Sequence, residues 1–160
     1  GVLIRAWTYI LVMGSDGLQS ASEMSVLNAN YIKAALTDLF TIPFAGLCKH
    51  EFVASAAKLL ENTGISAQDV AKALIERGIH PPTVYFPLNV KEALMIEPTE
   101  TESPETLDKF IQVLKEIAEQ AEQNPDVIHN APQGQIVTRV DEVQAARKPV
   151  LRYTKTEKQQ

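Results

Sequence analysis

The sequence predicts a layered α/β domain of the small α+β kind, with two long helices in front of it. Three observations support this fold class. Helix and strand patterns alternate from residue 41 onward, 45% of the residues are hydrophobic, and 160 residues are enough to bury one ordinary core. The charged fraction of 22% is that of a globular chain and not of a disordered one.

Two helical patterns lead the chain. Residues 2–13 carry apolar side chains on nearly every face, which is typical of a helix that is buried on all sides. The Gly-Ser-Asp-Gly run at 14–17 predicts a turn, and residues 18–39 then repeat apolar positions at helical spacing. We expect both helices to stand apart from the layered domain and to connect it to a larger one.

The expected division of the chain is connecting helices at 1–40, a small C-terminal α/β domain at 41–153 and a polar tail at 154–160. Because the chain begins on glycine inside an apolar pattern, we expect it to be the C-terminal piece of a longer protein. The apolar start is well short of the roughly 20 residues that a membrane helix needs, and it lacks the basic region and cleavage site of a signal peptide. We therefore expect no membrane association.

The layered domain begins with a strand pattern at 49–54. Ser66 and Asp69 then match a capping box, so a helix is expected from Ser66 to Arg77. Gly78 fits the left-handed position that commonly follows a helix end.

The second half of the domain holds two short apolar strand patterns, at 83–86 and 93–96. Ser103 and Pro104 predict the start of a helix that carries a single apolar stripe and ends at Asn124. Residues 125–134 are expected to form a loop, residues 137–146 a strand followed by a short helix, and residues 148–153 an extended basic run.

Three polar residues, Asn28, Asn30 and Tyr31, lie in the middle of the second leading helix. One interpretation is a solvated helix face with an anchoring tyrosine. The other is a set of polar groups that face a cleft or a partner subunit. We favour the solvated face, because polar residues on a helix surface usually face water.

Charge and residue types exclude several classes of function. The formal net charge is −5, so nucleic acid is not an expected partner. Cys48 is the single cysteine and cannot form an internal disulfide, which suits the reducing cytoplasm. His50, His80 and His129 show no metal-binding spacing, and the sequence contains no phosphate loop, nucleophile elbow or zinc-protease motif.

The stretch at 80–103 is rich in proline, and its backbone is correspondingly rigid. It contains Pro81, Pro82, Pro87 and Pro98, which forbid a helix through it. Rigid backbone that presents polar groups at a strand end is a common way to build one wall of a site. Two prolines follow His80 directly and restrict its backbone, so His80 is a candidate site residue. We expect the other two histidines, His50 and His129, to be structural.

Glu97 ends the second strand pattern and is fixed by Pro98. Glu97 and Glu100 could form an acid–base pair, but acidic residues before a helix also simply complement the helix dipole. Three arginines could bind a carboxylate or a phosphate, or could be surface charges or subunit contacts: Arg139, Arg147 and Arg152. From the residues alone, the chain is a globular domain with one rigid polar rim and no assigned reaction.

The runs His80-Pro-Pro-Thr-Val-Tyr-Phe-Pro-Leu and Glu92-Ala-Leu-Met-Ile-Glu-Pro-Thr-Glu-Thr-Glu-Ser103 closely resemble glycine decarboxylase, the pyridoxal-phosphate enzyme of the glycine cleavage system. Further matches are Val26-Leu-Asn-Ala-Asn-Tyr31, His50-Glu-Phe52 and Ala145-Ala-Arg-Lys-Pro-Val-Leu-Arg-Tyr153. The ending resembles the C-terminal part of subunit 2 in the split bacterial form of this family. Residues 41–49 and 127–135 match the family less well.

The resemblance implies a fold and a set of partners. The fold is the C-terminal small domain of a pyridoxal-phosphate-dependent transferase of the aspartate aminotransferase type, preceded by two connecting helices. The implied partners are the missing large cofactor domain, subunit 1, a second copy of subunit 2 and a lipoyl carrier protein, all in the cytoplasm.

The resemblance also implies an oxidoreductase reaction. Glycine loses its carboxylate as CO₂ while pyridoxal phosphate accepts the electrons, and the aminomethyl group passes to the lipoyl arm of the carrier. The Schiff-base lysine is expected upstream of this chain. The 160-residue piece alone should therefore be inactive and should not hold the cofactor covalently.

By position in the matched motifs, five residues are expected to line the substrate pocket as a mobile wall that orients glycine and excludes water: His80, Thr83, Tyr85, Glu97 and Thr99. No catalytic residue and no metal ligand is expected in this chain. Two alternatives stay open: a non-catalytic interaction or oligomerisation domain, and an isolated one-domain enzyme that uses Glu97 and Glu100 as acid and base.

Overall fold

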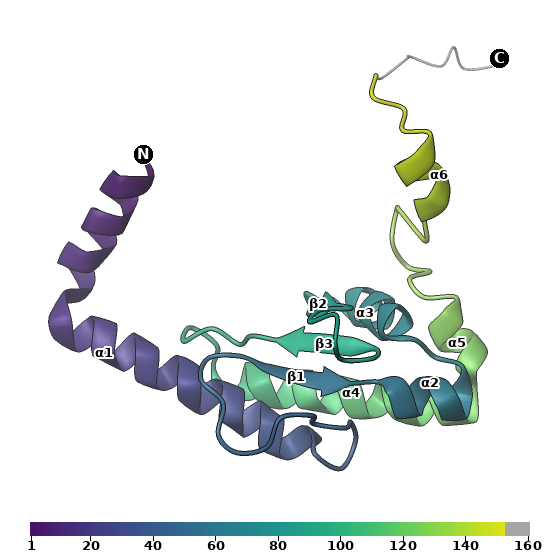
Figure 1. Ribbon diagram of the computed structural model, residues 1–160, viewed down its shortest axis with the longest axis horizontal. Helices are drawn as coiled ribbons and strands as arrows, with labels where there is room; N and C mark the ends of the chain where they lie inside the picture. The colour runs from purple at the N-terminus through teal and green to yellow at the C-terminus, as the bar shows by residue number, and fades with distance from the viewer. Residues whose placement is uncertain (153–160) are drawn as a thin grey trace.

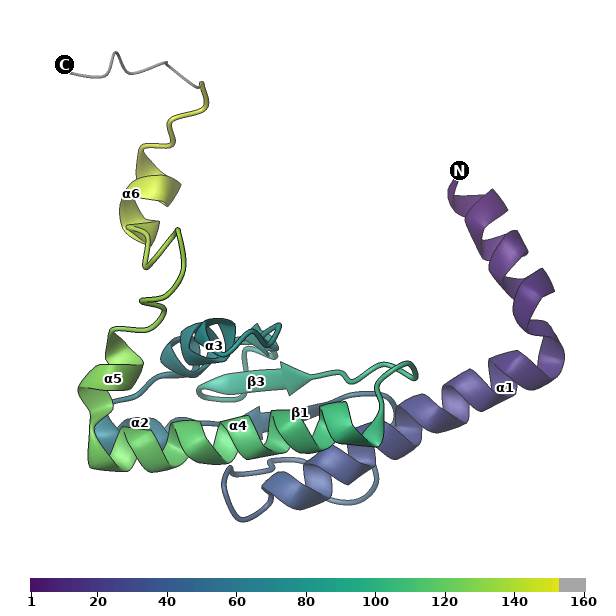
Figure 2. The same ribbon diagram turned by 180° about the vertical axis from the view of Figure 1, so that it is seen from behind.

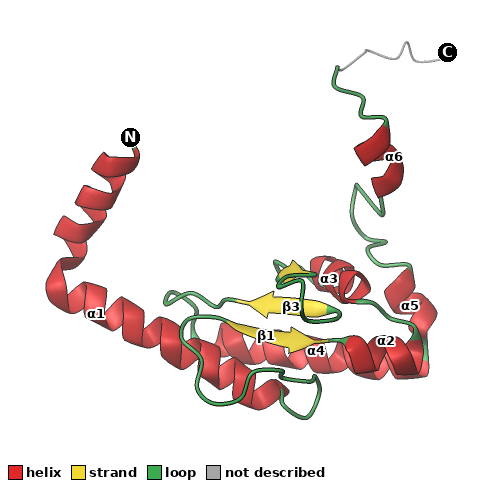
Figure 3. Ribbon diagram, viewed as in Figure 1, coloured by secondary structure: helices red, strands yellow, loops and turns green. Residues whose placement is uncertain are grey.

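The computed structural model describes residues 1–152. Its helices and strands follow one another as a layered α+β domain between two projecting ends (Figure 3). In chain order they are α1 (Val2–Leu36), β1 (Phe52–Ser55), α2 (Ala57–Thr63), α3 (Ala67–Glu76), β2 (Thr83–Val84), β3 (Ala93–Ile96), α4 (Pro104–Gln123), α5 (Pro125–His129) and α6 (Glu142–Arg147).

The sheet has three antiparallel strands in the order β1-β3-β2. Phe52 pairs with Ile96 and Ala54 pairs with Leu94, so these apolar side chains share one face of the sheet. The long helix α4 runs along the sheet, behind it in Figure 1 and in front of it in Figure 2. The apolar stripe of α4 and the apolar face of the sheet thus close a single core.

The two interior positions of α4 that are completely buried are Leu114 and Ile117. They belong to the same cluster as Leu74 of α3 and Leu94 of β3. Because apolar residues recur at helical spacing along α4, the strip that reaches the core is continuous from its first turn to its last.

Helix α1 is bent at one glycine. Gly14 has φ 62° and ψ −173°, a backbone conformation that is open to glycine and strained for other residues. The break is therefore a single residue within one element, where the sequence predicted a four-residue turn between two helices ending at residue 39. Figure 1 shows the first part of α1 projecting away from the domain.

The second part of α1 belongs to the core, and our expectation that both leading helices stand apart from the layered domain is wrong for this part. Ala29, Ile32 and Leu36 are fully or almost fully buried, and they cluster with residues of α4 and the sheet. The first part is different, because residues 2–12 expose most of their large apolar side chains.

Replacing Gly14 by alanine should straighten α1. A Cβ at position 14 would meet nothing within 4 Å, so the obstacle is the backbone angle and not a neighbour. Keeping the bend would cost alanine about 1–3 kcal/mol, whereas continuing the helix uses its high helix propensity. Spin labels at positions 3 and 27, both exposed, should move apart in G14A by pulsed electron resonance. S20A, a change at an exposed position within the helix, should leave their separation unchanged, and an unaltered distribution in G14A would contradict this prediction.

The predicted starts of α3 and α4 are confirmed. Ser66 accepts a hydrogen bond from the backbone N–H of Asp69, and the Asp69 carboxylate accepts one from the N–H of Ser66, which completes the capping box. Gly78 has φ 72°, as expected after the end of α3. Ser103 caps α4 with Pro104 at its first position.

Several short elements differ from the prediction. Helix α2 was missed and α5 replaces the first part of the expected loop at 125–134, because helices of seven and five residues carry too little periodicity to recognise. Residues 137–141 form no strand, while the short helix that should follow is present as α6. Tyr153 and the predicted tail at 154–160 lie outside the described residues.

None of the helices within residues 1–152 combines the length and the apolarity that crossing a membrane requires.

Candidate functional site

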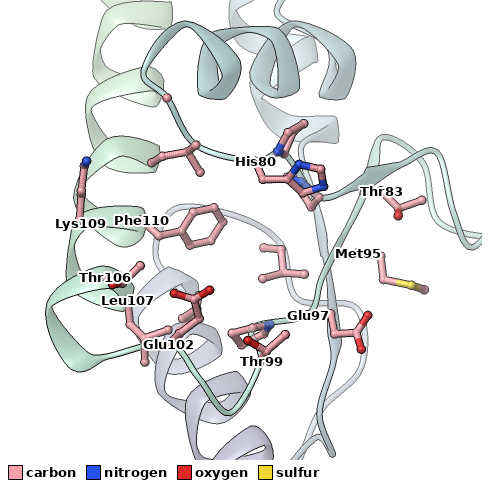
Figure 4. Close-up of a pocket in the computed structure, with 17 residues that line it drawn as sticks. His80, Thr83, Met95, Glu97, Thr99, Glu102, Thr106, Leu107, Lys109 and Phe110 are labelled. Carbon is pink, nitrogen blue, oxygen red and sulfur yellow. The ribbon is translucent and has the colours of Figure 1, made fainter. Parts of the chain in front are cut away.

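A cavity of about 500 Å³ opens where β3 ends, between this strand, α4 and the segment that follows α3 (Figure 4). Its floor is apolar and includes Ile32, Ile96, Leu107 and Phe110. Its rim is polar and includes His80, Thr83, Glu97, Thr99, Glu102 and Lys109. The cavity therefore combines an apolar interior with a few convergent polar groups, which is the usual composition of a small-molecule site.

Two proline-fixed segments build most of this rim. His80 stands directly before Pro81 and Pro82 and leads into β2, and Glu97 follows the last residue of β3 and stands directly before the buried Pro98. Proline fixes φ and restricts the residue before it, so the backbone at both positions is held locally. Figure 4 places Glu97 and Glu102 on either side of Thr99, with His80 across the cavity from them.

Four of the five residues expected in the pocket lie around this cavity: His80, Thr83, Glu97 and Thr99. Tyr85 does not line it. Tyr85 has φ 59°, is 41% exposed and begins the loop between β2 and β3. Among the described residues, Glu102 and not Glu100 is the second carboxylate of the cavity.

Glu97 has a neighbour that the sequence did not indicate. The Nε2 atom of His50 lies 3.8 Å from Oε1 of Glu97, and both side chains are about half exposed. His50 comes from the segment between α1 and β1, so a third part of the chain reaches the edge of the site. Nothing in the spacing of the histidines could have paired His50 with a residue 47 positions later.

Two asparagines of α1 bind the loops near this edge, so the interpretation of a solvated face is wrong for both. Asn28 is only 4% exposed, and its Nδ2 atom donates to the carbonyls of Thr99 at 2.9 Å and Glu102 at 3.4 Å. Asn30 donates to the carbonyl of Cys48 at 2.8 Å and accepts from the N–H of Cys48 at 3.0 Å.

Tyr31 fits the anchoring interpretation. Its hydroxyl donates to the Asp108 carboxylate of α4 at 2.5 Å. This hydrogen bond, together with the negative charge of Asp108, raises the pKa of Tyr31 above its usual value.

A second cluster of charges surrounds Asp69, away from the cavity. Arg139 lies 2.7 Å from the nearly buried Asp69 carboxylate, and it also donates to the carbonyls of Ala131 at 2.8 Å and Ile128 at 3.3 Å. Nδ1 of His129 lies 3.6 Å from the same carboxylate. Arg139 therefore binds a carboxylate, as one interpretation of the sequence allowed, and is not a free surface charge. The carboxylate belongs to Asp69 of the same chain, so the contact joins α3 to the C-terminal segment.

The pKa of Asp69 reflects opposing influences. Burial by itself raises it, but hydrogen bonds from the Ser66 hydroxyl and N–H and the contact with the Arg139 guanidinium outweigh burial, so the pKa lies below its ordinary value. Arg147 and Arg152, the other two candidate arginines, are exposed.

The cavity residues do not fit a phosphate-bearing cofactor. The rim carries the two carboxylates of Glu97 and Glu102, and Lys109 lies on the far side from Glu97 (Figure 4). A phosphate dianion needs converging backbone N–H groups or several cations. Across the described part of the chain, no three His, Cys, Asp or Glu side chains are grouped so that they could hold a metal ion.

Comparison with known proteins gives consistent matches. The family model described as "Glycine dehydrogenase, C-terminal domain" matches residues 21–138. The chain is 57% identical over 152 residues to the "Probable glycine dehydrogenase (decarboxylating) subunit 2" of Thermotoga petrophila, covering 95% of this chain and 32% of that protein. The protein of the same name from Staphylococcus haemolyticus is 56% identical over 153 residues, covering 96% and 31%.

A solved structure agrees with these matches. The crystal structure of glycine decarboxylase (P-protein) of the glycine cleavage system, in inhibitor-bound form, superimposes with a TM-score of 0.55 at 25% identity, covering 68% of this chain and 24% of the other. The chain thus spans about a third of the length of the curated relatives it matches.

Proposed function

The chain belongs to the glycine dehydrogenase C-terminal domain family, and from that premise we propose that it forms the C-terminal part of a glycine decarboxylase subunit 2, contributing one wall of the site that decarboxylates glycine. One observation carries the proposal. All the residues that line the cavity, from Ile32 to Phe110, lie inside the matched range 21–138, and ten of them belong to the two runs, 80–88 and 92–103, that resemble this family.

The wall is assigned a binding role in the reaction. His80, Thr83, Glu97 and Thr99 orient glycine from the polar rim, and a carboxylate such as Glu97 is suited to receive the ammonium group of the substrate. The apolar floor, which includes Phe110, keeps water away from the reacting group. Tyr85, beside the rim at the start of the exposed β2–β3 loop, joins the wall when that loop closes over the substrate.

Pyridoxal phosphate, when bound in the intact enzyme, supplies the electron sink for loss of CO₂. We assign it, with its Schiff-base lysine, to the part of the enzyme that this chain does not span, because the cavity rim is too acidic to hold a phosphate. The aminomethyl product then passes to a lipoyl carrier protein.

The partners are proposed from the two projecting ends. We define the N-terminal arm as residues 2–13 and the C-terminal arm as residues 136–151, which carry exposed apolar side chains such as Val2, Leu3, Trp7, Ile136, Val143 and Leu151. Figures 1 and 2 show the N-terminal arm and α6 on the same side of the sheet. Surfaces of this kind suit a large cofactor domain, subunit 1 or a second copy of subunit 2. We place the assembly in the cytoplasm, where a single free cysteine stays reduced.

The test is alanine substitution in the intact, cofactor-loaded enzyme. H80A and E97A should each lower kcat/KM for release of CO₂ from glycine about tenfold or more, the effect of one lost positioning contact. E100A is the matched control, since Glu100 is a nearby carboxylate that does not line the cavity. Unchanged kcat/KM in both H80A and E97A would overturn the proposal, and an equal loss in E97A and E100A would favour an acid–base pair instead.

A second candidate is a non-catalytic interaction or oligomerisation domain, which the exposed apolar arms favour. It predicts that polar substitutions at Trp7 and Leu11 abolish assembly while H80A and E97A leave the activity of the assembled enzyme intact. Catalytic loss in the assembled H80A and E97A enzymes would exclude it.

A further inference from the structure

The segment of α1 from Asn28 to Lys33 binds both loops that carry the Glu97–His50 edge of the cavity. We propose that Asn28 and Asn30 are positioning residues that set the geometry of this edge for the substrate. The inference rests on the proposed function, because it assumes that Glu97 contacts the substrate.

Asn28 binds the loop at residues 97–102 through its side-chain amide. Its amide group donates to the carbonyls of Thr99 and Glu102, while the N–H of Glu102 donates to the same Thr99 carbonyl at 3.3 Å. The two acceptors enclose the turn between β3 and α4, and three rim residues, Glu97, Thr99 and Glu102, lie in or next to it. A single buried side chain thus fixes the turn at two points.

Asn30 holds the other loop. It exchanges two hydrogen bonds with the backbone of Cys48, and the ammonium group of Lys33 adds bonds to the carbonyls of Phe44 at 3.0 Å and Gly46 at 2.6 Å. His50 follows Cys48 by two residues and faces Glu97. The position of Glu97 is therefore set by Asn28 through its own loop and by Asn30 through His50.

Packing alone does not require these amides. Ala29 and Ile32 already supply the apolar contact of this part of α1 with the core. Burying an amide at position 28 is unfavourable unless its N–H groups find acceptors, and the acceptors here are rim carbonyls from residues 71 and 74 positions away. Because the acceptors are backbone carbonyls of the rim, losing the amide donor should change the geometry of the rim before that of the core.

The test uses N28D in the intact enzyme. Aspartate keeps the size of asparagine but loses both N–H donors and places a carboxylate against two carbonyls. N28D should lower kcat/KM for CO₂ release at least tenfold, mainly through a higher KM, because two hydrogen bonds are lost and a carboxylate then faces two carbonyls. S25A is the matched control, since the Ser25 hydroxyl bonds only to the carbonyl of Ala21 inside the same helix.

A double variant separates positioning from general destabilisation. If Asn28 acts through Glu97, the E97A/N28D enzyme should be no more than about twofold worse than E97A alone. Fully additive losses would show that Asn28 acts elsewhere and would overturn the inference. If E97A itself has no effect, the proposed function fails, and the inference that these residues position the rim is then decided by the exchange measurement below.

Hydrogen exchange of the intact enzyme supplies a readout that does not depend on activity. N28D should speed exchange about tenfold in peptides covering residues 97–103, and N30D should do so in peptides covering 44–51, with the core of α4 unchanged. Exchange that rises throughout the chain, or in neither segment, would overturn the inference. N30D serves as the second variant should N28D not fold, because the carboxylate that it introduces can still accept from the N–H of Cys48.

Discussion

Replacing Asp69 by alanine should lower the free energy of unfolding by about 2–4 kcal/mol, since it removes a nearly buried carboxylate that pairs with the partly exposed Arg139 and completes a helix cap. Arg139 would lose its carboxylate, and the Ser66 N–H and hydroxyl would lose their acceptor. Urea unfolding at pH 7 measures the change. D141A is the matched control, because Asp141 caps the short helix α6 on the exposed surface, and it should cost less than about 1 kcal/mol. A loss in D69A no larger than that in D141A would contradict the assignment.

The same carboxylate gives stability a defined dependence on pH. The pKa of Asp69 is lower in the folded protein than in the unfolded chain, so its contribution is fully present above the unfolded value of about 4 and is lost as the pH falls through the folded value. The wild-type protein should therefore lose more stability than D69N between neutral and acidic pH. Equal acid sensitivity in the two proteins would mean that Asp69 is not responsible.

Leu114→Ala should destabilise the protein by about 2–5 kcal/mol. Leu114 lies on the buried stripe of α4 with none of its surface exposed, so removing its side chain leaves a cavity between α4 and the sheet. Thermal or chemical unfolding measures the loss. K115A, one residue further along α4 and exposed, should stay within about 0.5 kcal/mol of wild type. A Leu114 variant that is equally mild would show that this part of the core relaxes to fill the space.

Sequence patterns were sufficient to predict the elements that a few neighbouring residues determine. The cap at Ser66, the cap at Ser103 and the strand β3 all follow from a few neighbouring residues, and each was predicted close to its observed bounds. The rigid polar rim was also foreseeable, because prolines beside His80 and Glu97 act on the backbone next to them.

The features that escaped prediction depend on contacts between distant residues. Asn28, Asn30 and Arg139 resemble ordinary surface residues until the loops they bind are in place. The pairing of His50 with Glu97 and the role of Glu102 in the cavity likewise arise from the tertiary fold. Residue spacing along the chain carries no information about such partners, so they are visible only in the structure.

Because the N-terminal arm and α6 project on the same side of the sheet, their direction also decides where a tag or label can be attached. A purification tag or surface-immobilisation handle placed beside the N-terminal arm or α6 would stand on the side where both project (Figure 1), and would compete with any chain that assembles there. The segment between α1 and β1 lies on the opposite side of the sheet, with Leu47 at 91% exposure. A cysteine-reactive dye or surface anchor at Leu47→Cys, in a Cys48→Ser background so that the free Cys48 does not react, would leave the assembling side free for binding measurements.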